Sequence, residues 1–154
     1  MNPIVMLISG GVFGTLGFSL MFKVNPKHIP ISTLGGIISC AIYIAFDLLG
    51  ANPFVSNFLA MLVSALLCEI FARIFRAPAA IFLLPCVIPL VPGRGLYYTM
   101  SSLISENYDA VVSYGKSTLL TALGIAAGMI VASAVWAMVT HYTSKKNITK
   151  NGAR

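Results

Sequence analysis

The chain has 154 residues, of which 58% are hydrophobic and only 9% are charged, whereas an ordinary soluble domain carries about 25% charged residues. A soluble domain of this size leaves too much surface exposed to hide so many apolar side chains, so a soluble fold is excluded. The formal net charge of +6 comes from basic residues in short loops and near the C-terminal end. Membrane topology explains such a distribution, and nucleic-acid binding is not expected.

Five apolar segments predict an all-α integral membrane protein, a bundle of five transmembrane segments of which the fourth is broken by prolines. The long segments have about 20 residues, enough for a helix to cross a bilayer. We expect residues 1–142 to form one helical membrane domain and residues 143–154 a polar cytoplasmic tail. The segments cover residues 3–22, 31–49, 54–75, 79–92 and 117–140, and residues 93–116 are expected to form an interfacial helix or loop.

The basic residues predict how the chain lies in the cell membrane. If all five segments cross, eight basic residues face one side and two face the other. The richer side is expected to be cytoplasmic, which places the N-terminus outside and the C-terminus inside. A re-entrant fourth segment gives a weaker split of six against four, so five crossings are favoured. The eight are Lys23, Lys27, Arg73, Arg76, Lys145, Lys146, Lys150 and Arg154, and the two are Arg94 and Lys116.

The fourth segment carries a run of helix breakers, "PCVIPLVPGRG", with Pro85, Pro89, Pro92, Gly93 and Arg94. Irregular backbone at membrane depth survives only where it is buried in protein or lines a cavity. Transporters use such breaks to bind substrates and ions. The run therefore predicts a substrate path, with Arg94 as a partner for a carboxylate. The alternative is a kinked helix whose Arg94 is only an interfacial charge.

Acidic residues inside the spans are the other candidates for function. Glu69 and Arg73 stand four residues apart on one helix face, with the acid first, which is the favourable order for an ion pair. Intramembrane acids often mark substrate or proton pathways, so this pair is either a coupling site or a structural pair. Asp47, near the end of the second segment, is expected to be an interfacial acid or a cap, and its role stays open.

Small residues four positions apart predict close helix contacts. Gly10 and Gly14 share one helix face, and so do Gly124, Gly128 and Ala132. Small side chains let backbones approach each other in membranes. The sequence leaves open whether the contact lies within the chain, with a second copy or with another subunit.

No enzyme active site, cofactor or metal site is predicted. The cysteines Cys40, Cys68 and Cys86 lie inside apolar runs, widely separated and without a metal-ligand spacing. Buried cysteines of this kind behave as small hydrophobic residues.

Three stretches of the chain resemble the threonine/serine exporter family. The stretch "RAPAAIFLLPCVIPLVPGRGLYYTM" resembles the family's signature, and "GFSLMFKVNPKHIPISTLGGIISCAIY" resembles its first loop and second helix. "CEIFARIFRAP" is similar too, and the short five-segment layout resembles the small YjjB-like subunit, equivalent to the C-terminal half of single-chain exporters. The positions that match best are Pro85, Pro89, Pro92, Gly93 and Tyr97, followed by Glu69, Arg73 and Pro78, whereas Arg94 is not a fixed family position.

The resemblance implies a secondary exporter of threonine and serine or, in some members, of dicarboxylates such as succinate. It also implies a larger, separately encoded membrane subunit as partner. On this hypothesis Tyr97 joins the prolines, Gly93 and Arg94 along the substrate path. The alternative hypothesis is a non-transporting membrane subunit that stabilises the larger partner, with the proline stretch as a docking surface.

Overall fold

The computed structural model describes the backbone of residues 3–151 and the side chains of residues 10–141. Throughout this described backbone the regular elements are helices, with no strand, so the all-α class is confirmed. The elements in chain order are α1 (Pro3–Met21), α2 (Ile29–Leu48), α3 (Pro53–Ile74), α4 (Ala79–Val87), the short 3-10 helix η1 (Ile88–Leu90), α5 (Gly93–Ile104) and α6 (Tyr108–Asn151).

The first three helices begin and end within two residues of the predicted segments. Proline explains where two of them start. Pro53 is the first residue of α3, and Pro30 lies in the first turn of α2. A helix has no intrahelical acceptor for its first amide groups, so proline loses nothing there.

The fourth and fifth segments differ from the prediction. The expected segment over residues 79–92 is divided into α4 and η1, and the chain then bends by 43° into α5. The expected fifth segment, residues 117–140, is the middle of a much longer helix, α6. Residues 93–116 are therefore α5 and the first turns of α6. The helix also continues through most of the predicted tail to Asn151, and residues 152–154 lie outside the described chain.

Three described helices, α2, α3 and α6, are long and apolar enough to cross a membrane. The bent pair formed by α4–η1 and α5 makes a fourth if it counts as one span. The described side chains of α1 begin only at Gly10, and the helix from there to Met21 is apolar but short. Five spans therefore stay a prediction.

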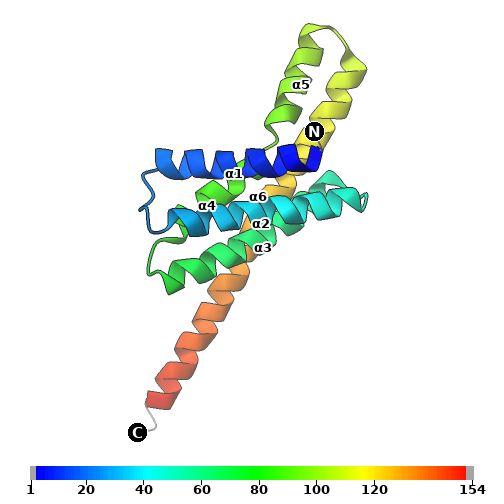
Figure 1. Ribbon diagram of the computed structural model, residues 1–154. Coiled ribbons are helices and arrows are strands. Elements are labelled where there is room, and N and C mark those ends of the chain that lie inside the picture. The colour runs from blue at the N-terminus through cyan, green and yellow to red at the C-terminus, as the bar shows by residue number, and fades with distance from the viewer. Residues whose placement is uncertain (1–2, 152–154) are drawn as a thin grey trace.

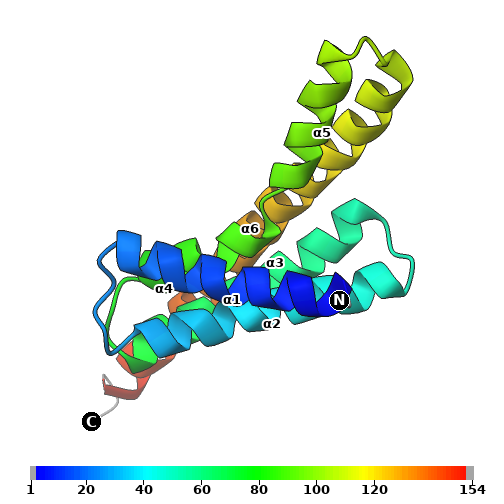
Figure 2. The ribbon, with the colours of Figure 1, turned by 45° about the horizontal axis from the view of Figure 1, so that its top comes forward.

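The helices form a bundle from which one hairpin projects. Helices α1 to α4 lie side by side, and the long α6 crosses them, as Figures 1 and 2 show. Helix α5 runs back along the first part of α6, and the two together extend beyond the bundle. No side chain of α5 is buried. The break before α5 thus lies where the hairpin meets the bundle.

The interior of the bundle is rich in small polar side chains, and large apolar side chains face outward. Phe13, Leu20 and Met21 on α1 are 75%, 66% and 74% exposed. In contrast Ser39 and Ser64 are fully buried, and the Ser39 hydroxyl donates to Ser64 Oγ at 2.5 Å between α2 and α3. Such a distribution suits a lipid surrounding, because lipid tails solvate large apolar groups and hydroxyls join helices inside.

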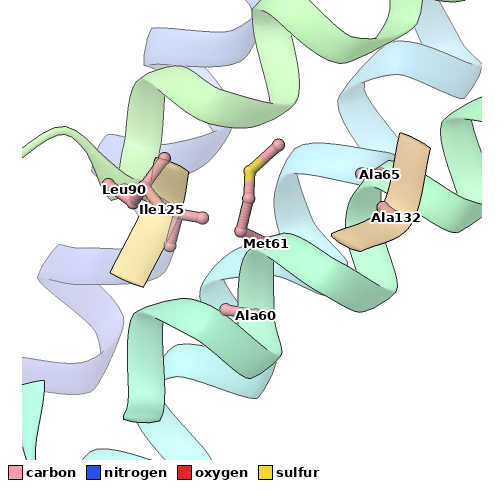
Figure 3. Close-up of a cluster of buried hydrophobic side chains, with 6 residues drawn as sticks. All are labelled: Ala60, Met61, Ala65, Leu90, Ile125 and Ala132. Carbon is pink, nitrogen blue, oxygen red and sulfur yellow. The ribbon is translucent and has the colours of Figure 1, made fainter. Parts of the chain in front are cut away.

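Helices α3 and α6 meet along a contact that we call the glycine seam, formed by Gly124 and Gly128 of α6 against the backbone of α3. A Cβ atom on Gly124 would lie 2.5 Å from the Phe54 carbonyl oxygen, and one on Gly128 would lie 2.7 Å from that of Phe58. Ala132 is buried in the same cluster as Ala65, further along both helices (Figure 3). The predicted close packing of the second small-residue set is thus confirmed within the chain.

The order of these contacts shows that α3 and α6 run in the same direction, although their axes cross at an angle (Figure 1). Residue numbers rise together on both helices, from Phe54 with Gly124 to Phe58 with Gly128. Two helices that run in the same direction need a connection that returns from the end of the first to the start of the second. Helices α4 and α5, with η1 between them, provide that return.

Candidate functional site

The break between η1 and α5 is centred on Val91 and Pro92. Val91 adopts an extended conformation (φ −60°, ψ 127°), whereas the residues before it are helical. A residue that precedes proline is pushed out of the helical region by the proline ring, so Pro92 accounts for the break. Pro85 lies inside α4 and Pro89 in η1, and neither ends the helical path there. The change from α-helix to 3-10 helix thus falls just before Pro89, and the extended residue of the break precedes Pro92.

A pocket of about 630 Å³ opens beside this break. Its wall comes from the end of α2, the start of α3, the break itself and the part of α6 that faces α5. The charged residues of the lining are Asp47 and Arg94, and most of the others are polar or glycine and proline. The lining consists of Tyr43, Asp47, Asn57, Pro89, Leu90, Val91, Pro92, Gly93, Arg94, Gly95, Tyr98, Tyr114, Ser117, Thr118 and Thr121.

Close packing of α5 on α6 shapes one side of the pocket. A Cβ atom on Gly95 would collide with the Thr118 hydroxyl, so glycine at this position lets the two helices touch. One turn further along α5, the rings of Tyr98 and Tyr114 stack with their centroids 5.4 Å apart. Both tyrosines are partly exposed, at 41% and 43%, and together they form a rim of the mouth.

The inner end of the pocket is closed by apolar side chains. Leu90 lines the pocket and belongs to the buried cluster that also contains Met61 and Ile125. Figure 3 shows Met61 between Leu90 and Ile125 on one side and Ala65 and Ala132 on the other. Asn57, one turn before Met61 on α3, is 2% exposed and donates from Nδ2 to the Pro53 carbonyl at 2.7 Å. The pocket therefore has exposed charged residues, Asp47 and Arg94, and its floor touches the buried apolar cluster at Leu90.

The structure brings four of the predicted path residues to this pocket and leaves two outside. Pro89, Pro92, Gly93 and Arg94 line it. Pro85 is buried inside α4, away from the lining. Tyr97 is 68% exposed on α5 and does not line the pocket, whereas the next residue, Tyr98, does. The functional roles of all these residues stay predictions.

Glu69 and Arg73 lie on α3, beyond the pocket floor. No ion pair joins them among the side chains that the structure describes. The Arg73 guanidinium instead lies over the Trp136 ring of α6, 5.4 Å from its centroid. A cation above an indole ring is attracted by the ring's electrons, so this contact adds to the packing of α3 and α6.

The sequence interpretation missed several lining residues. Asp47 was expected to be an interfacial acid or a cap, and Asn57, Tyr43 and the α6 hydroxyls were not singled out. Asn57 did carry a signal, because an amide inside an apolar span needs a partner. The sequence showed that Asp47 is an acid near the end of a span. Only the packing of α2 against the break shows that it lines the same pocket as Arg94.

The three cysteines lie in the interior. Cys68 on α3 and Cys86 on α4 have their sulfur atoms 3.5 Å apart, and Cys40 is buried between α1 and α2. Among the described residues, no group of three or more histidine, cysteine, aspartate or glutamate side chains is placed to hold a metal ion.

Comparison with known proteins supplies the context for this site. Residues 8–135 match the family described as "Threonine/Serine exporter, ThrE", which covers most of the chain and includes α2 to α5 in full. No curated protein and no solved structure matches the chain. The family is one of membrane exporters, and the long apolar helices agree with a multi-pass membrane protein. The chain with the polar pocket beside a broken helix therefore belongs to the threonine/serine exporter family.

Proposed function

We propose that the chain is a subunit of a secondary-active exporter of threonine and serine, and that the pocket beside the α4–α5 break is its substrate site. The observation that carries the proposal is the position of Arg94. This arginine lies in the first turn of α5 and lines a polar pocket, in a chain that belongs to an exporter family. Broken helices in transporters offer their free backbone groups to substrates in the same way.

The N-terminal end of α5 suits a carboxylate. The first backbone bond to a carbonyl four residues earlier runs from Leu96 to Pro92, so the amides of Arg94 and Gly95 precede the regular ladder. The positive end of the helix dipole lies at the same point. A substrate carboxylate bound here would interact with the positive end of the helix dipole. It would also accept two parallel hydrogen bonds from the Arg94 guanidinium.

The proposed orientation places the pocket mouth on the outer side of the cell membrane. The excess of basic residues predicts that the end of α2 and the start of α3 face outward, and Asp47 and Asn57 lie near these ends. The common direction of α3 and α6 supports a complete crossing between them, rather than a re-entrant fourth segment. In this state the floor around Met61 separates the pocket from the cytoplasm.

A larger membrane subunit is the proposed partner. Added Cβ atoms on Gly10 and Gly14 would meet nothing within 4 Å, so this face of α1 has room for a neighbouring helix. Small-residue faces of this kind are typical helix contacts in membranes. The alternative hypothesis is that the chain only stabilises the larger subunit. The two hypotheses differ in whether Arg94 is needed for transport or only for assembly of the complex.

Replacement of Arg94 tests the proposed function. We would place Arg94→Gln in the chromosomal gene of the native host and measure efflux of labelled threonine and serine. Loss of a hydrogen bond to a charged group costs about 1.5–3 kcal/mol, so efflux at low substrate concentration should fall about tenfold to a hundredfold. Lys116→Gln, which removes a basic residue from α6 outside the pocket lining, is the control and should leave efflux unchanged.

The amount of subunit in the membrane must also be measured. Normal efflux by Arg94→Gln at a normal protein level would contradict the proposal. Loss of efflux together with loss of the assembled complex would support the structural alternative instead.

A further inference from the structure

Asp47 occupies a position that its own helix does not explain. It lies in the last turn of α2, where the helix dipole is negative and an acidic side chain is electrostatically unfavourable. The end of α2 is closed by backbone bonds from Leu49 to Ala45 and from Gly50 to Asp47. Within the described side chains, the Asp47 carboxylate takes part in no hydrogen bond or ion pair. A capping role is therefore wrong for this residue.

Asp47 instead shares the pocket with one opposite charge. Arg94 lines the same pocket from the start of α5, and no ion pair joins the two among the described side chains. The other lining residues are uncharged, so the formal charges of the lining sum to zero. Both charges therefore line one pocket without an ion pair among the described side chains, and a ligand with two opposite charges would match them.

Charge complementarity then separates two classes of substrate. A zwitterionic amino acid with its carboxylate at Arg94 and its ammonium at Asp47 would match both protein charges. A dicarboxylate finds one cation and meets the Asp47 carboxylate with its second negative charge. Like charges brought together repel each other, so such a pocket disfavours the dianion.

We propose that Asp47 is the residue that determines substrate specificity, by binding the ammonium group of an amino acid and excluding dicarboxylates. This inference rests on the proposed export function and on the pocket as its substrate site. It goes beyond the proposal by assigning the choice between the two substrate classes to one side chain on α2.

The test measures the preference between threonine and succinate. Efflux of labelled threonine and of labelled succinate would be compared in host cells that carry the wild-type chain, Asp47→Asn or Asp47→Glu in the chromosomal copy. The control is Asp109→Asn, the same chemical change at an exposed acid in the first turn of α6, outside the pocket lining. The subunit level in the membrane is measured for every variant.

We expect the wild-type chain to export threonine and not succinate. Asp47→Asn should lower threonine efflux about tenfold and reduce the preference for threonine over succinate by a similar factor, because an ionic partner is replaced by a neutral one. Asp47→Glu should retain the preference, and Asp109→Asn should behave as wild type. An unchanged preference in Asp47→Asn would overturn the inference.

The inference and the proposed function fail in different ways. Wild-type cells that export neither substrate, or export that is independent of Arg94, would remove the proposed function. Arg94-dependent export that is unaffected by Asp47→Asn, or that favours succinate in the wild type, would leave the export function standing and overturn the role of Asp47.

Discussion

Glycine closes the space between two helices at the glycine seam, whereas proline opens a pocket beside the α4–α5 break. In the seam, Gly124 and Gly128 bring α6 against the backbone of α3, and no space remains between the helices. At the break, Pro92 drives Val91 out of the helix, and a pocket of about 630 Å³ opens. The two regions lie on the same helix, α6, one or two turns apart. The molecule thus places an open pocket directly beside a close contact between two helix backbones.

This arrangement suits a transporter because a substrate site needs a fixed wall. Ser117, Thr118 and Thr121 on α6 line the pocket, and the seam begins at Gly124. Side chains carried by a closely packed helix are held in fixed positions, which a binding site requires. If this division of roles holds, substitutions in the seam should affect folding, and substitutions at the break should affect transport.

The largest expected effect belongs to the seam. Gly124→Ala and Gly128→Ala place a methyl group 2.5 Å and 2.7 Å from backbone carbonyl oxygens, which cannot move away as a flexible side chain would. Overpacking of this kind costs about 1–3 kcal/mol per site, so the double substitution should greatly reduce the amount of folded protein in the membrane. Gly115→Ala on the same helix is the matched control, since a Cβ atom there meets only the Thr99 side chain at 3.6 Å, an ordinary contact, and its level should stay normal. Equal levels for the double variant and the control would show that the seam is not a close contact.

The second effect concerns the break. Pro92→Ala releases Val91 to adopt helical dihedral angles, so η1 and α5 can join and the pocket loses its shape. If Arg94 then no longer reaches the substrate, one charged hydrogen bond is lost, and threonine efflux should fall about tenfold. The protein level should stay close to wild type. Pro26→Ala, in the exposed loop before α2, should leave efflux unchanged. Efflux at the wild-type rate in Pro92→Ala would mean that the break is not needed for transport.

The third prediction concerns Glu69, which lies on α3 outside the pocket lining. We propose that Glu69, half-buried on α3, couples export to the proton gradient, as intramembrane acids do in other transporters. Glu69→Gln should therefore leave the protein level unchanged and abolish the dependence of threonine efflux on the pH difference across the membrane. The exposed Glu106→Gln serves as control. Coupling through Glu69 would be wrong if the pH dependence persisted in Glu69→Gln.

The smallest effect distinguishes two neighbouring tyrosines. Tyr98 lines the pocket and stacks on Tyr114, whereas Tyr97 is largely exposed outside the lining. Loss of one neutral hydrogen bond costs about 0.5–1.5 kcal/mol, so Tyr98→Phe should weaken apparent affinity about two- to tenfold. Tyr97→Phe should have no measurable effect on affinity. A stronger effect at Tyr97 than at Tyr98 would place the substrate on the other face of α5.

Much of the fold was predictable because local chemistry decides it. Apolar runs of bilayer length and prolines such as Pro53 set the extent of α2 and α3, and spacing predicted the contact made by Gly124 and Gly128. The break itself was predictable from its prolines, but not that its extended residue precedes Pro92. Pro85 and Pro89 fit within helical turns once neighbouring helices hold them, and this depends on tertiary packing.

The site was less predictable than the fold because its residues come from distant parts of the chain. Asp47, Asn57 and Thr121 meet Arg94 only when α2, α3 and α6 pack around the break. The residue pattern within a single segment does not indicate which other segments it contacts. Residues 93–116 were expected to form an interfacial helix or loop, and the sequence did not indicate that α6 starts as early as Tyr108 and continues into the fifth segment.

Protection of an introduced thiol by substrate tests the central claim, that the pocket binds the exported amino acid. Ser117→Cys puts a thiol in the pocket wall, and Ser101→Cys puts one on the exposed side of α5 outside the lining. The three native cysteines are buried and should react little with a membrane-impermeant thiol reagent added from outside. We predict that threonine and serine slow the labelling of Ser117→Cys and leave that of Ser101→Cys unchanged. Labelling of Ser117→Cys at the same rate with and without threonine, in cells that still export threonine, would contradict the claim.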